Sequence, residues 1–194
     1  MLTGRTKLVR PAYEGGGAMF LWIGCKLPAE FEKEIRTFCL EKNEQIGLDT
    51  VAFSLPQHIS LKISFDTDRA EGILEDLRQF AATQAPFFVQ LLAAEQAGNI
   101  LWLPVKENEH LRQLHNALDA RLESRFGIPQ HRFDKCFLFH STLFMDGNLE
   151  KLTKMQSALS GYPLPDTLRI DTFLLGISET GKPGTYRVVR EIKV

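Results

Sequence analysis

Hydrophobic positions along this chain change period several times, and the changes divide it into helices and strands. Apolar residues three or four apart are typical of a helix packed on one side, and short apolar runs between turn residues are typical of strands. The pattern predicts helices over 28–43, 68–82, 108–126 and 148–159. It predicts strands over 18–26, 86–96, 99–105, 137–145, 166–178 and 185–194, and one more after Pro56 within 51–65. This interleaving predicts an α+β fold with mostly antiparallel sheets.

Glycine residues mark several ends of these elements. Gly98 and Asn99 form a good hairpin turn between two strand runs, and Gly127 suits the end of the long third helix. Residues 1–17 end in three consecutive glycines, so we expect a loosely held arm there. Residues 18–194 are then predicted to form one domain.

The predicted elements occur twice in the same order. The first half reads strand, helix, motif strand, helix and hairpin, and the second half continues with helix, motif strand, helix and hairpin, so it resembles a repeat of the first. The repeat predicts two similar lobes that share a core.

A short motif occupies the same place in both halves. It reads His, any residue, a small hydroxyl residue and Leu, at 58–61 and again at 140–143. Both copies lie in runs of strand character, where residues two apart point to the same side. His58 and Ser60 are therefore expected to share one face of a strand, and His140 and Thr142 the same face of another.

The residues around the motifs follow from the same alternation. Ile59, Ser141 and the two motif leucines are expected to point away from the histidines, and Ser141 is an unusual residue for a core. Lys62 and Phe144 would share the face of the histidines, where Lys62 would add charge to a phosphate and Phe144 would stack on a base.

Two imidazoles and two hydroxyls suit phosphodiester chemistry. Breaking a phosphodiester without a metal requires a base, an acid, and donors that hold the non-bridging oxygens. Imidazole has an ordinary pKa near 6.5, so two histidines can hold opposite protonation states near neutral pH. We expect the four motif side chains to form one site if the two strands meet.

Composition narrows the classes of partner and compartment. A net charge of −1 disfavours a protein that binds duplexes through a broad basic surface. The three cysteines form no CxxC pair, which favours a reducing compartment. The N-terminus lacks the apolar centre of a secretion signal, and no apolar run reaches the length of a membrane span. The expectation is a cytoplasmic protein that does not associate with membranes.

The paired motifs and the order of elements resemble those of the 2H phosphoesterase superfamily, over residues 18–194. This group includes the bacterial 2′-5′ RNA ligase-like proteins and cyclic phosphodiesterases. The resemblance implies a bilobal α+β fold, with two pseudo-symmetric lobes of mostly antiparallel sheet and outer helices around a central cleft. Ser60 stands where threonine is commoner, and Phe139 stands where relatives often carry proline.

The resemblance also implies roles for particular residues. His58 and His140 would act as acid and base, in an order that the sequence leaves open, while Ser60 and Thr142 would bind phosphate. Tyr186 lies where many relatives place an aromatic residue near the cleft. The expected protein is a metal-independent, cofactor-free monomer. Its expected substrates are 2′,3′-cyclic phosphates, 2′-5′-linked RNA ends or small nucleotides.

Other function classes carry less support from the sequence. A non-catalytic RNA- or nucleotide-binding module and an interaction protein with the inherited fold are the alternatives to an enzyme. A Ser-His hydrolase lacks its GxSxG elbow here. No phosphate-binding glycine loop is present, so ligation that depends on ATP is disfavoured. Ligation by an energy-neutral reversal of cyclic-phosphate opening stays open.

The remaining histidines are predicted to lie outside the site. His110 and His115 are five residues apart on one helix and so do not share a face, and both are expected at the surface. His131 lies in a polar loop, solvated but within possible reach of the cleft. The chain lacks the HExxH spacing, and we expect no metal site.

Overall fold

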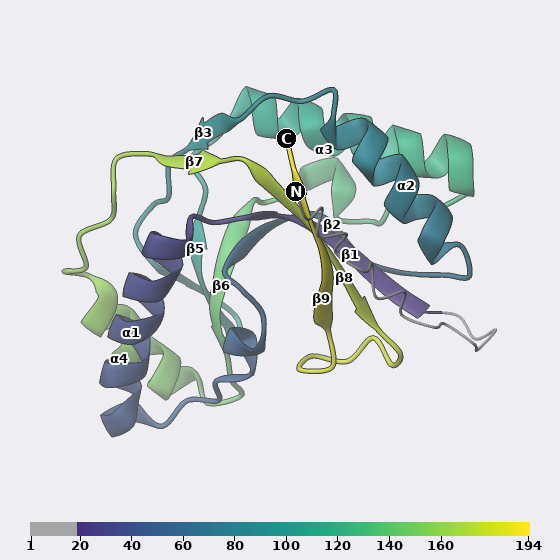
Figure 1. Ribbon diagram of the computed structural model, residues 1–194. Helices are drawn as coiled ribbons and strands as arrows, with labels where there is room; N and C mark the ends of the chain where they lie inside the picture. The colour runs from purple at the N-terminus through teal and green to yellow at the C-terminus, as the bar shows by residue number, and fades with distance from the viewer. Residues whose placement is uncertain (1–18) are drawn as a thin grey trace, which may run out of the picture.

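The computed structural model describes residues 19–194, and the predicted arm at 1–17 lies outside them. Strands and helices alternate as expected (Figure 1), and every strand pairing among the described residues is antiparallel. The predicted α+β class is therefore confirmed.

Four helices form where the apolar spacing predicts them. They are α1 (Ala29–Ile46), α2 (Ala70–Ala81), α3 (Glu109–Phe126) and α4 (Leu149–Leu159), with short 3-10 turns η1 (Val51–Ser54) and η2 (Asp134–Cys136). Gly127 ends α3 with a φ of 69°, as predicted. None of the helices within residues 19–194 is long and apolar enough to cross a membrane.

Nine strands form three sheets within the described residues. They are β1 (Met19–Lys26), β2 (His58–Thr67), β3 (Phe87–Val89), β4 (Glu95–Ala97), β5 (Ile100–Pro104), β6 (His140–Met145), β7 (Leu168–Ile170), β8 (Thr172–Ser178) and β9 (Arg187–Lys193). One sheet has the order β2-β1-β8-β9, another has the order β4-β5-β6, and β3 pairs with β7. The predicted runs 86–96 and 166–178 each divide into two strands, because their first residues pair with each other in the two-stranded sheet.

The predicted repeat is visible as β1-α1-β2-α2 followed by β5-α3-β6-α4, and the helices are exchanged between the two halves. Helix α1 packs on α4, which covers β4 and β5, whereas α3 packs on α2 and on β2. The two helix pairs lie at separate places on the molecule, with β2 and β6 running between them (Figure 1). Helix α3 of the second half thus packs on β2, and η1 of the first half packs on β6.

Both motif strands carry one extra residue at the motif leucine. In β2, Ser60 and Lys62 pair with consecutive residues of β1, so Leu61 bulges. In β6, Thr142 and Phe144 pair with consecutive residues of β5, so Leu143 bulges.

After each bulge, the residue that follows points to the opposite face of the sheet from the one that strict alternation predicts. Lys62 is 1% exposed and Phe144 is fully buried, so neither shares the face of the histidines. The predictions that Lys62 meets a phosphate and that Phe144 stacks on a base were wrong, because strict alternation fails where a bulge inserts a residue.

Candidate active site

A cavity of about 300 Å³ lies where the two motif strands meet. His58 and Ser60 of β2 and Thr142 of β6 line it. Ile59, Leu61, Ser141 and Leu143 are buried behind these strands, as alternation predicts up to the bulge. The structure therefore brings residues 82 positions apart in sequence to one hollow.

The two motif histidines have matching hydrogen bonds. His58 Nδ1 lies 2.8 Å from the carbonyl oxygen of Pro56, and His140 Nδ1 lies 2.7 Å from that of Leu138. A carbonyl oxygen only accepts, so each Nδ1 carries the hydrogen. This leaves Nε2 of each ring as the nitrogen that a ligand can reach, and the neutral ring can accept a proton there.

Burial sets the charge of both rings. Burial lowers the pKa of His58 to about 4. The hydrogen bond to the Pro56 carbonyl opposes this shift, and the positive charge that His140 carries when protonated adds to it. Burial also lowers the pKa of His140, against the hydrogen bond to Leu138. Both imidazoles are therefore neutral at pH 7 in the unliganded protein. His140 is not among the residues that line the cavity, and its place beside it follows from Thr142, which lies two residues later in β6.

Two tryptophans lie against these histidines, although the motifs do not include them. The Trp22 ring stacks on His58 with centroids 4.3 Å apart, and the Trp102 ring lies 4.1 Å from that of His140. They are the only tryptophans in the chain, and each stands on the strand that pairs with its motif strand. That shared placement is the signal that sequence reasoning missed.

Gln57 is a second residue that the sequence did not indicate. It precedes His58, is almost fully buried and lines the cavity. Its side-chain oxygen accepts a 2.7 Å hydrogen bond from Ser141 Oγ. The serine that looked out of place in a core is thus paired with a polar group of the other motif.

Tyr186 also lines the cavity, although it precedes β9 rather than lying within it. Its hydroxyl is hydrogen bonded to Ser64 Oγ of β2. The loop before it closes one side of the cavity, because a Cβ on Gly184 would lie 2.7 Å from the Val51 side chain of η1. Glycine is required at this contact, since its φ of 78° is also unfavourable for other residues.

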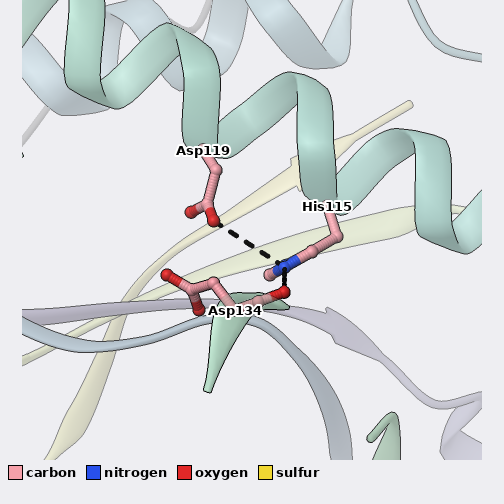
Figure 2. A group of neighbouring side chains, drawn as sticks. All are labelled: His115, Asp119 and Asp134. Carbon is pink, nitrogen blue, oxygen red and sulfur yellow. Dashed lines mark hydrogen bonds and ion pairs between the residues drawn. The ribbon is translucent and has the colours of Figure 1, made fainter. Parts of the chain in front are cut away.

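A buried charged cluster lies between α3 and β2, and Figure 2 shows three of its residues, His115, Asp119 and Asp134. His115 and Asp119 project from α3 toward Asp134, and these three residues bring possible metal ligands within 4.8 Å of one another. However, Lys62 Nζ lies 2.7 Å from Asp119 and 2.7 Å from Asp134. The ammonium group already supplies the cation that these carboxylates require, so the cluster does not fit a metal ion.

The prediction that His115 lies at the surface was therefore wrong. It is 1% exposed, and its Nδ1 lies 2.7 Å from the Leu61 carbonyl oxygen of β2. The missed signal is that His115 and Asp119 are four residues apart and so share a face of α3. His110 is exposed as expected, and His131 is partly buried beside the cluster, where its backbone N–H donates to Asp134.

Comparisons with known proteins agree with this architecture. Residues 28–182 match the sequence profile described as the 2′-5′ RNA ligase superfamily. No curated protein matches the chain.

Solved structures with the same fold include the E. coli protein LigT in complex with 3′-AMP. It has a TM-score of 0.58 at 19% identity, over 91% of this chain and 98% of that one. TT0787 of Thermus thermophilus has a TM-score of 0.56 at 20% identity, over 90% and 97%. A structure described as a phosphoesterase has a TM-score of 0.56 at 20% identity, over 91% and 98%.

Proposed function

The chain belongs to the 2′-5′ RNA ligase superfamily, a family of phosphoesterases, and from this premise we propose that it is itself a metal-independent phosphoesterase. Its proposed substrates are 2′,3′-cyclic phosphates, 2′-5′-linked RNA ends or small nucleotides. The observation that carries the proposal is that His58, Ser60 and Thr142 line one cavity, with His140 two residues before Thr142 in β6.

The proposed reaction uses the free Nε2 of each motif histidine. One neutral imidazole takes a proton from the attacking hydroxyl or water. The other gains a proton when the substrate binds, because the negative phosphate raises its pKa, and it then donates that proton to the leaving oxygen. Which ring takes which role depends on the orientation of the substrate.

Ser60 and Thr142 supply the donors for the non-bridging oxygens. Each lies two residues after its histidine on the same face, so both hydroxyls reach the space beside the imidazoles. Hydroxyl donors held in a partly buried site stabilise the charge that develops on a phosphoryl group.

The size of the cavity supports a small substrate. Ligand pockets span about 300–1,000 Å³, and a cavity of about 300 Å³ is at the lower end. It suits one nucleotide or the terminal residue of an RNA. E. coli LigT has been solved with 3′-AMP and with ATP, which is consistent with a nucleotide in this place.

The test is turnover of a panel of 2′,3′-cyclic nucleotides, 3′,5′-cyclic nucleotides and 2′-5′-linked dinucleotides in the presence of EDTA. We expect activity on at least one of them to survive chelation. His58→Ala and His140→Ala should each reduce it by about 10²–10⁴-fold. His110→Ala, which changes an exposed histidine on α3, should leave it unchanged.

Two results would contradict the proposal. Activity that disappears with EDTA would show that the reaction depends on a metal. Tight binding without turnover of any substrate would show that the chain is a nucleotide-binding module.

A further inference from the structure

The imidazole of each motif histidine is enclosed in the same way in both halves. A carbonyl two residues earlier accepts a hydrogen bond from Nδ1, and an indole from the paired strand covers a face of the ring. The interplanar angles are 29° for Trp22 with His58 and 36° for Trp102 with His140. Two independent stretches of sequence thus build one arrangement twice.

The rest of the structure keeps Trp22 in this position. A Cβ on Gly176 of β8 would overlap Trp22 Nε1, and a Cβ on Gly24 would lie 2.8 Å from the same indole. The Cβ on Gly24 would also lie 3.3 Å from His58. Glycines on β1 itself and on the neighbouring β8 therefore leave the space that the indole occupies.

Simple core packing does not account for the choice of tryptophan. The Nε1 atoms of Trp22 and Trp102 are both buried, and neither has a hydrogen-bond partner among residues 19–194. A buried donor without a partner costs free energy that leucine or phenylalanine would avoid. The feature that both residues share is the contact of their rings with a motif histidine.

We propose that Trp22 and Trp102 are positioning residues, each of which holds the imidazole of its own half so that Nε2 is presented to the substrate. The inference rests on the proposed function for its role in catalysis. With one nitrogen bonded to a carbonyl and one face against an indole, the ring has little freedom to rotate about its χ2 bond. The indole also keeps water from that face.

Exclusion of water contributes to the neutral state of the rings. Burial is the largest cause of the lowered pKa at both histidines. The neighbouring titratable group that affects His58 is His140, which lowers the pKa of His58. The Leu138 carbonyl raises the pKa of His140 through its hydrogen bond. Removal of an indole should therefore move the pKa of its own histidine up, toward the ordinary value near 6.5.

Trp102 offers the cleaner test, because it is only partly buried whereas Trp22 is 5% exposed. Trp102→Leu removes the aromatic face, and Trp102→Phe keeps one. The His140 ring resonances and their pH titration are followed by NMR in the unliganded protein. This measurement does not depend on catalysis, so its outcome is separate from that of the turnover assay.

In Trp102→Leu we expect the His140 ring protons to move downfield as the ring current is lost and the His140 pKa to rise. The ring protons and pKa of His58 should change less. Trp102→Phe should remain close to the wild-type protein in both. In the turnover assay, Trp102→Leu should lower kcat/KM by up to about 100-fold, with the acidic limb of its pH profile displaced to higher pH.

Phe87→Leu is the matched control, because Phe87 lies 4.8 Å from the ring of exposed His110, outside the site. It should leave the His140 titration unchanged. A folded Trp102→Leu protein with wild-type His140 shifts and pKa would overturn the proposal, as would an equal effect of Phe87→Leu.

If Trp102→Leu does not fold, Gly176→Ala takes its place. This substitution should displace Trp22 and raise the His58 pKa, and an unchanged His58 titration would likewise overturn the proposal.

Discussion

Ser141 donates a 2.7 Å hydrogen bond to the side-chain oxygen of Gln57, and this bond joins the two motifs directly. Gln57 immediately precedes His58, and Ser141 immediately follows His140. Both side chains are buried, so the bond is shielded from water. It ties β2 to β6 at the level of the two histidines and so contributes to their spacing.

Ser141→Ala should therefore destabilise the protein and misalign the histidines. It leaves the buried Gln57 oxygen without its donor, which costs about 1–3 kcal/mol. Denaturant unfolding measures the loss. Ser157→Ala, which removes an exposed hydroxyl bonded within α4, should cost less than about 0.5 kcal/mol. A double-mutant cycle of Ser141→Ala with Gln57→Met should give a coupling energy close to the whole cost of Ser141→Ala. If the effects of the two substitutions simply add, the bond does not contribute to stability.

The buried ion cluster predicts a large loss of stability in Lys62→Met. The substitution leaves Asp119 and Asp134 buried without their cation, which costs about 3–5 kcal/mol. Lys26→Met is the matched control on the neighbouring strand, because Lys26 pairs with the exposed Glu191 and should cost about 1 kcal/mol or less. Equal shifts in the denaturation midpoints of the two variants would contradict this account of the cluster.

Acidification should destabilise the protein through the motif histidines. The folded-state pKa of His58 is about 4, below the ordinary value near 6.5, so between these values the unfolded chain binds a proton that the folded chain does not. The contribution of His58 to the free energy of unfolding should fall as the pH drops from 6.5 to 4, by at most about 1.4 kcal/mol per pH unit. Above pH 6.5 this contribution should not change with pH.

The check is urea unfolding of the wild-type protein and His58→Gln from pH 4 to 8. The variant should show a shallower dependence over the acidic range. Parallel curves for the two proteins would assign the acid sensitivity to other groups, and His110→Gln serves as the control for loss of an exposed histidine.

The two motif hydroxyls should matter for turnover more than for stability. Thr142→Val keeps the shape of the side chain but removes the donor, and Ser60→Ala removes the donor of the other motif. Loss of one donor to a developing charge costs about 10²–10³-fold in kcat. Thr142→Ser keeps the hydroxyl and should retain most of the activity. Equal activities of Thr142→Val and Thr142→Ser would remove the hydroxyl from the proposed mechanism.

The sequence alone determined the class of fold and most of its elements. The apolar spacing on each helix and the turn at Gly98 depend on neighbours within a few residues, and all four helices and the hairpin of β4 and β5 form as predicted. The alternation at His58 and Ser60, and at His140 and Thr142, is also local. It therefore placed each histidine on the same face as its hydroxyl.

Only the tertiary structure decided which distant groups share an environment. Bulges at Leu61 and Leu143 depend on the register with a partner strand, and they moved Lys62 into the core. The exchange of helices between the halves buried His115 against β2. The indole that covers each histidine comes from a paired strand, and the contact between Gln57 and Ser141 comes from the meeting of β2 and β6. Such pairings follow from packing over long separations, which no local spacing encodes.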